Sequence, residues 1–381
     1  RQGQQQALCI NPRRGAGMVD ALNLTPRSMY PAIALTAGYF VLSLAIGFFN
    51  KWALGTRWRG GAGFTFPFFY STMHMLCSFV VVSIIYLVRP SLCTVSRAQF
   101  KTHWSSLTVL ALLYTISVSC NNASLQTTSL SVKYLITGVT PLPTMALSYV
   151  MEKKGYTWPF VGVVSLQVLG ALLAVPWDGG AATAYGVLLS VLSVFASAGK
   201  PVLSGILMRE RHETGLTPLA LVWYYTAIAT CFMSILTLVS YDERSYLYIE
   251  LRSQVWRSCV AIIVGSLLAA AYNILMFYLT LVTSALTNTM LGNVKQVVII
   301  IITFASAGQF NAPVVFIGAI SVFIVTSMYG YMLTTTKSWW WRQAFPSGSD
   351  GLLDGHKGLK GAGEGSKLLD GQAEQSCCIV C

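Results

Sequence analysis

Ten apolar segments, separated by shorter polar or basic stretches, constrain the fold of this chain more than any other feature. Each has about 20 residues, enough for a helix rising about 1.5 Å per residue to cross about 30 Å of hydrocarbon. Hydrophobic residues make up 54% of the 381 residues and charged residues only 10%, unlike a soluble domain. We therefore predict an all-α integral membrane protein with ten transmembrane helices. Their expected positions are about 31–49, 66–88, 106–125, 129–151, 159–175, 184–208, 218–240, 256–281, 284–305 and 313–333.

The ten segments divide at Asp178-Gly179-Gly180 into five and five. An odd number of spans per half gives the halves opposite topology, which predicts two inverted five-helix repeats. The expected ten-helix domain covers 30–335, with repeats at 30–178 and 179–335. It is flanked by an N-terminal tail at 1–29 and a C-terminal tail at 336–381, whose Gly, Ser, Lys and Asp content predicts disorder.

The basic residues between the segments predict the orientation. Outside the C-terminal tail, thirteen Lys and Arg residues fall on the face that carries the N-terminus and six on the other. The positive-inside rule therefore places both termini in the cytosol. This rule also accounts for the net charge of +12, and no basic stripe with interleaved aromatics indicates nucleic-acid binding. The final residues, Cys378 to Cys381, fit a prenylation pattern, although an unmodified tail is the simpler interpretation.

Lys295 lies about halfway along the ninth segment, in Gly292-Asn293-Val294-Lys295-Gln296. A lysine at the centre of a bilayer costs about 3 kcal/mol on insertion scales, so it is expected to face a water-filled cavity. We interpret it as the charge that binds an anion.

The third and fourth segments contain further candidate site residues. Asn121 and Asn122 end a polar third segment, where they could either join helices or line a cavity. The fourth segment contains Thr137, Pro141 and Pro143, which predict a bent or locally open helix. Such helices often line binding sites.

Several of these features together resemble one known family. They are ten spans with cytosolic termini, Asn50-Lys51-Trp52 followed by Phe66-Pro67, and the centre Gly292-Asn293-Val294-Lys295. The chain resembles the triose-phosphate translocator and nucleotide-sugar transporter family of the drug/metabolite transporter superfamily over about residues 30–335.

The resemblance implies a substrate-binding site, and this chain lacks two of the cations that the family has there. In the family's phosphate translocators, a Gly-Asn-x-x-Lys-Arg centre supplies two cations to the substrate phosphate. Here one residue instead of two separates Asn293 from Lys295. Lys295 is retained, Gln296 stands in place of the Arg, and Thr137 stands in place of a fourth-span Lys. Tyr272-Asn273 looks like the family's eighth-span Tyr-Asn. The expected substrate-binding residues are Lys295, Tyr272, Asn273, Asn293, Gln296, Thr137, Asn121, Asn122, Lys200, Lys51 and Lys133.

These departures favour a larger substrate than a triose phosphate. Arg holds phosphate through a rigid fork that Gln cannot replace, so a small phosphate ester would be bound less well. A nucleotide-sugar, with many hydroxyls and amides, suits the remaining side chains. Lys200 occupies a sixth-span position where the family often has a basic residue. Lys51 and Lys133 could add charge, although ordinary anchoring near the span ends is an equal alternative.

We therefore expect an antiporter that exchanges an anionic nucleotide-sugar, with a nucleoside monophosphate as counter-substrate, by alternating access. A sugar-phosphate/phosphate antiporter of the plastid type and a non-transporting membrane regulator are the alternatives. No enzyme, cofactor or metal site is expected, because no cluster of catalytic or ligating residues shares one membrane depth. The expected location is the Golgi or endoplasmic reticulum membrane, with the plastid envelope as alternative. Membrane lipids are the surrounding partners, and a homodimer is possible.

Overall fold

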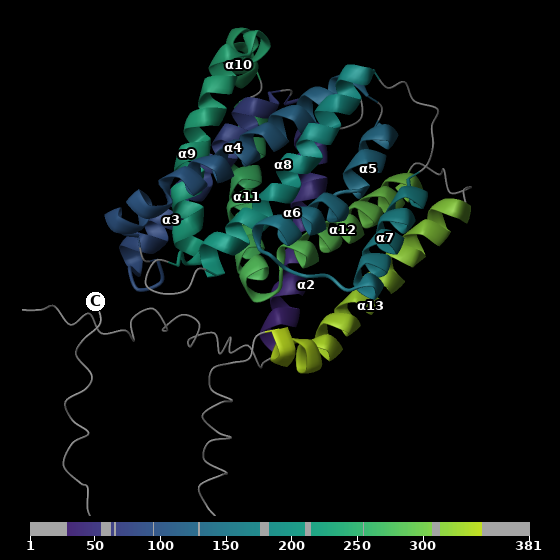
Figure 1. The fold of residues 1–381 in the computed structure, drawn as a ribbon. Coiled ribbons are helices and arrows are strands. Elements are labelled where there is room, and N and C mark those ends of the chain that lie inside the picture. Colours follow the sequence, from purple (N-terminus) through teal and green to yellow (C-terminus); the bar gives the residue numbers. More distant parts are fainter. Residues whose placement is uncertain are drawn as a thin grey trace, which may run out of the picture. The chain divides into compact units, whose positions relative to one another are not determined.

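The computed structural model describes residues 29–344 except 55–61, 65, 94, 129, 176–182, 210–214, 254 and 307–312. In this part the chain is helical, with no strand (Figure 1). It divides into two compact units, 1–328 and 329–381, and the candidate site lies within the first. The helices are α2 (Met29–Leu54), α3 (Pro67–Val88), α4 (Arg97–Thr127), α5 (Leu130–Gly138), α6 (Pro141–Met151), α7 (Trp158–Leu173), α8 (Ala184–Arg209), α9 (Pro218–Val239), α10 (Tyr241–Ser253), α11 (Val255–Val282), α12 (Ala285–Ser306) and α13 (Pro313–Ala344).

Eight of the described helices are long and apolar enough to cross a membrane. They are α2, α3, α4, α8, α9, α11, α12 and α13. The prediction of a helical, multi-pass membrane protein is confirmed. The fifth predicted span is the shorter helix α7, of 16 residues, and the fourth is divided between α5 and α6. The arrangement as ten spans in two inverted repeats stays a prediction.

The break between α5 and α6 follows from Pro141. Proline has no N–H, and its ring clashes with the preceding turn of a helix. The backbone therefore turns at Val139 and Thr140, and the N–H of Leu142 donates to the carbonyl of Val139 at 3.0 Å. The carbonyl of Gly138 thereby loses its usual helical partner.

Helix α10 lies between the seventh and eighth predicted spans, where the sequence predicts no helix because charged and aromatic residues interrupt any apolar pattern. It joins α9 to α11, and its Glu243 is buried, with 3% of its surface exposed. The Glu243 carboxylate accepts the backbone N–H groups of Phe68 at 2.7 Å and Phe69 at 2.6 Å. It thus caps the N-terminus of α3, where the helix dipole favours negative charge.

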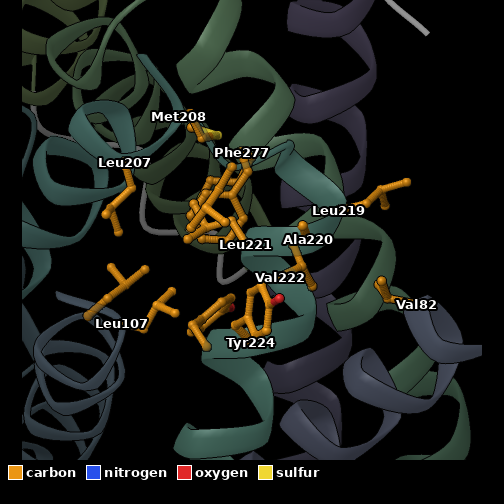
Figure 2. Close-up of a cluster of buried hydrophobic side chains, with 14 of the residues drawn as sticks. Val82, Leu107, Leu207, Met208, Leu219, Ala220, Leu221, Val222, Tyr224 and Phe277 are labelled. Carbon is orange, nitrogen blue, oxygen red and sulfur yellow. The ribbon is translucent and has the colours of Figure 1, made fainter. Parts of the chain in front are cut away.

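The main apolar core lies among α3, α4, α8, α9 and α11. Figure 2 shows part of it, with Leu107, Leu207, Leu221 and Phe277 among the labelled side chains. Small residues let the helices approach: Gly199 of α8 lies against Leu113 of α4, which would be 3.0 Å from an added Cβ. Helices α4 and α8 pack along each other, as do α3 and α9. Each of these pairs joins one predicted half to the other.

At the C-terminal end, α13 continues to Ala344, nine residues past the predicted tail boundary at 335. No glycine or proline stops the helix until Pro346. The remainder of the predicted disordered tail, including the terminal cysteines, lies outside the described residues, as does the N-terminal tail 1–28.

Candidate functional site

Lys295 lies near the middle of α12, as predicted, and faces α11. Helix α12 begins after Ser284, whose hydroxyl accepts the N–H of Thr287 at 3.1 Å, so the first turn is capped. The Lys295 ammonium lies 5.6 Å from the centre of the Tyr272 ring. This distance allows a cation–π interaction, and the side chain of Lys295 remains partly exposed. The structure therefore brings these two predicted site residues together.

Tyr272 is paired with a tyrosine of the first helix. The rings of Tyr39 in α2 and Tyr272 in α11 are stacked, with centres 5.4 Å apart. Their hydroxyl oxygens lie 3.2 Å apart, within hydrogen-bonding distance. Tyr39 is almost completely buried, so this pair fixes the ring over which Lys295 lies.

A second lysine lies over a second tyrosine. The Lys200 ammonium of α8 lies 4.8 Å from the centre of the Tyr114 ring in α4. Tyr114 meets the edge of Tyr225 in α9, with ring centres 6.3 Å apart. Lys200 is also close enough to Lys295 for electrostatic repulsion between the two ammonium groups. Two ammonium groups that repel each other form an electrostatically favourable binding site for an anion.

We call this group the tyrosine–lysine site. Six helices contribute one side chain each, and residues distant in the sequence meet there. Its members are Tyr39 of α2, Tyr114 of α4, Lys200 of α8, Tyr225 of α9, Tyr272 of α11 and Lys295 of α12.

Three other predicted residues lie at the broken fourth span. The Asn293 amide donates to the released carbonyl of Gly138 at 2.9 Å, and the Gln296 amide donates to the carbonyl of Tyr134 at 2.9 Å. The Thr137 hydroxyl lies 3.3 Å from the Gln296 side-chain oxygen. Residues of α12 thus satisfy backbone groups of α5, which the bilayer could not hydrogen-bond. Asn293 and Gln296 hold the broken helix beside Lys295.

Of the remaining predicted residues, Lys133 is buried at 7% exposure and donates to the backbone carbonyl of Asn121 at 3.2 Å. The Asn273 amide is buried and lies 3.3 Å from the Ser78 hydroxyl of α3, a helix-packing contact. Asn121 and Asn122 are both half-buried near the end of α4. Lys51 belongs to α2, but its side chain lies outside the described residues.

Three members of the site, Tyr39, Tyr114 and Tyr225, are not among the substrate-binding residues predicted from the sequence. A tyrosine in the middle of an apolar segment could have indicated them, because a buried hydroxyl needs a partner. Among the described residues, no group of three His, Cys, Asp or Glu side chains could hold a metal ion. The site's chemistry is that of cations, hydroxyls and aromatic faces.

Comparison with known proteins identifies transporters that are similar to this chain. No protein-family profile matches the chain. A probable sugar phosphate/phosphate translocator of Arabidopsis thaliana is 28% identical over 319 residues, covering 82% of this chain and 95% of its own. UDP-uronic acid transporter 1 of the same plant is 26% identical and covers 74% of this chain and 88% of its own. The chain's curated relatives are sugar phosphate/phosphate translocators and nucleotide-sugar transporters.

These relatives, which belong to the drug/metabolite transporter family, are transporters and not enzymes. A third, UDP-galactose transporter 1 of Arabidopsis thaliana, is 20% identical over 80% of this chain and 88% of its own. The chain also shares its fold with a protein of known crystal structure. The TM-score is 0.55 at 12% identity, over 80% of this chain and 97% of the other. The relatives therefore indicate that the chain is a membrane transporter, and its substrate is inferred from the site.

Proposed function

We propose that this transporter is an antiporter that exchanges an anionic nucleotide-sugar for a nucleoside monophosphate by alternating access. The observation that carries the proposal is that the Lys200 and Lys295 ammonium groups lie beside one group of tyrosines, 4.8 Å and 5.6 Å from two ring centres. Two separated cations suit a diphosphate, whose charge spreads over two phosphate groups.

The tyrosines suit the rest of such a substrate. If the two ammonium groups move from the rings of Tyr114 and Tyr272 to the phosphates, these rings can stack on a flat base. Tyrosine hydroxyls can hydrogen-bond a sugar. Thr137, Gln296 and Asn293 lie at the α5–α6 break, and their amides and hydroxyl could exchange partners with the substrate. Asn121, Asn122, Asn273, Lys51 and Lys133 complete the proposed residue set.

Exchange is the simplest cycle for this site. The described carboxylates Glu152 and Glu243 stand at the ends of helices rather than beside Lys200 or Lys295. Anion exchange needs no carboxylate to carry a proton. In this cycle ten spans act as two inverted five-helix repeats that rock about the site, with the α5–α6 pair counted as one span. Both termini face the cytosol, and the membrane is that of the Golgi or endoplasmic reticulum.

The second candidate is a sugar-phosphate/phosphate antiporter. Lys200 favours it, because a second cation near Lys295 compensates for the family Arg that Gln296 replaces. The first relative named above is a probable translocator of this type. A single phosphate between two lysines would then be the bound group, and the location could be the plastid envelope.

Uptake into proteoliposomes tests both candidates. The purified protein is reconstituted into vesicles preloaded with a nucleoside monophosphate and is offered UDP-sugars, GDP-sugars, triose phosphate and phosphoenolpyruvate. Lys295→Ala is compared with Lys101→Ala, which removes an exposed lysine near the start of α4. Nucleotide-sugar uptake that requires preloading and disappears only in Lys295→Ala supports the proposal. Uptake restricted to the small phosphate esters supports the second candidate, and no uptake of either kind contradicts both.

A further inference from the structure

Arg209, the last residue of α8, joins three helix ends. Its Nη2 donates to the backbone carbonyls of Thr280 at 2.8 Å and Thr283 at 3.0 Å, at the end of α11. Its Nη1 lies 3.4 Å from Oε1 of Glu152, the residue that follows α6. Thr280 lies in the last turn of α11, at the negative end of the helix dipole, where carbonyls lack the usual helical donor, so a guanidinium is a favourable partner.

Glu152 completes this group. The Glu152 side chain is 6% exposed, and the Lys154 ammonium binds its other carboxylate oxygen at 2.8 Å. The α8 backbone comes very close to it, because a Cβ at Gly205 would lie 3.3 Å from Oε1 of Glu152 and 3.8 Å from the Thr280 side chain. The ends of α6, α8 and α11 therefore meet without space between them.

This junction lies at one end of the tyrosine–lysine site. Arg209 is nine residues beyond Lys200 along α8, about 13 Å along the helix. Thr280 is eight residues beyond Tyr272 along α11, about 12 Å. Both helices run from the site to the same junction, on the face that the sequence predicts to be cytosolic.

The junction joins two helices of one predicted half, α8 and α11, to one helix of the other, α6. Leu207 and Met208 of α8 share an apolar cluster with Phe277 of α11, so these two helices are also held by packing (Figure 2). Helix α6 belongs to the predicted first half, and its end meets Arg209 through a partly exposed ion pair. The Arg209 side chain is 30% exposed, so water can solvate its charge when the pair opens.

We propose that the Glu152–Arg209 contact closes one entrance to the tyrosine–lysine site and opens when the two halves separate. The proposal rests on the alternating-access function proposed above. Arg209 acts as a positioning residue: α11 carbonyls fix its guanidinium, and its remaining N–H groups hold Glu152. Opening this face during transport breaks the pair and leaves the α8–α11 contact intact.

Leak of substrate from proteoliposomes tests whether the Glu152–Arg209 contact closes the site. Vesicles loaded with radiolabelled nucleoside monophosphate are assayed for efflux with and without an external exchange substrate. Arg209→Gln and Glu152→Gln are expected to raise the ratio of unstimulated efflux to exchange by about three- to ten-fold, the population shift expected when a charge-assisted contact is lost. Arg209→Lys keeps the charge but not the fork, so it should give an intermediate ratio. Lys101→Gln, an exposed change on the same predicted face, should leave the ratio unchanged.

A purely structural role would lower efflux and exchange together and reduce the melting temperature. An unchanged ratio in both Gln variants, with unchanged melting temperature, overturns the proposal. Amide hydrogen exchange distinguishes failure of the closing contact from failure of the proposed transport function, because the measurement needs no transported solute. If the wild type exchanges none of the tested anions, the proposed function fails. Faster amide exchange at 148–154 and 205–209 in both Gln variants then still supports the closing contact, and equal exchange overturns it.

Discussion

The Lys295 ammonium lies 5.6 Å from the centre of the Tyr272 ring, and this ring is in turn stacked on Tyr39. A cation near the middle of a membrane helix is thereby held over an aromatic face instead of a carboxylate. The charge remains uncompensated by an acid at this contact, so it stays available to an incoming anion. The same arrangement is repeated by Lys200 over Tyr114.

This relationship predicts different effects of two substitutions at Tyr272. Tyr272→Leu removes the aromatic face, and we expect the apparent substrate affinity to fall about ten-fold, the size of one cation–π contact in a desolvated site. Tyr272→Phe keeps the face and loses only the 3.2 Å contact with the Tyr39 hydroxyl, so the loss should be about two- to three-fold. Concentration-dependent uptake in proteoliposomes measures both. Equal losses in Leu and Phe variants would show that the hydroxyl, not the ring, is the important group.

A second prediction concerns the broken fourth span. Asn293→Leu leaves the Gly138 carbonyl without the donor that now lies at 2.9 Å. A buried carbonyl without a partner costs about 1–3 kcal/mol, so the variant should melt at a lower temperature in detergent. Gly292→Ala is the matched control, because a Cβ at this neighbouring position meets nothing within 4 Å. If Asn293→Leu melts like Gly292→Ala, the hydrogen bond does not stabilise the break.

The sequence predicts the helical membrane fold and the central lysine because both depend on local properties. Apolar length determines where helices cross, and a single charge within such a length is easily recognised. The break at Pro141 is also local, since proline removes one hydrogen bond. Its repair by Asn293 depends on two segments about 155 residues apart, which no local pattern reveals.

The tyrosines and α10 were harder to predict for the same physical reason. Tyr39 and Tyr225 resemble ordinary apolar residues in a membrane segment until the fold places them beside Tyr272 and Tyr114. Helix α10 depends on Glu243 reaching the start of α3, which lies about 175 residues earlier. Asn273, adjacent to Tyr272, lies instead beside Ser78, because neighbouring residues on a helix point in different directions.

A third prediction concerns the contact between α7 and α13. A Cβ added at Gly318 would overlap backbone atoms of Leu173 and Ala174. Backbone atoms of a neighbouring helix cannot rotate away, so Gly318→Ala should destabilise the protein by about 1–3 kcal/mol. Gly162→Ala on α7 is the control, because its Cβ meets nothing within 4 Å and alanine favours a helix by about 1 kcal/mol. Thermal unfolding in detergent measures the difference, and equal melting temperatures would contradict the close approach.

The last prediction is a pH dependence that arises at Glu243. Burial raises the pKa of this carboxyl above its ordinary value of 4.5, and the N–H groups of Phe68 and Phe69 offset the rise only in part. The folded protein therefore binds this proton more tightly than the unfolded chain does. The contribution of Glu243 to the free energy of unfolding is then complete below the ordinary pKa and decreases as the pH rises through the folded-state pKa.

Melting temperatures measured between about pH 4 and pH 7 test this sign by comparing the wild type with Glu243→Gln. The amide cannot ionise, yet its oxygen can still accept one N–H of α3. We expect the wild type to lose stability relative to this variant as the pH rises, because only the wild type must bury a charge. A wild type that gains stability relative to Glu243→Gln over the same range would mean that the two N–H donors outweigh burial. The ionised carboxylate would then hold α10 on α3 more strongly than the protonated form does.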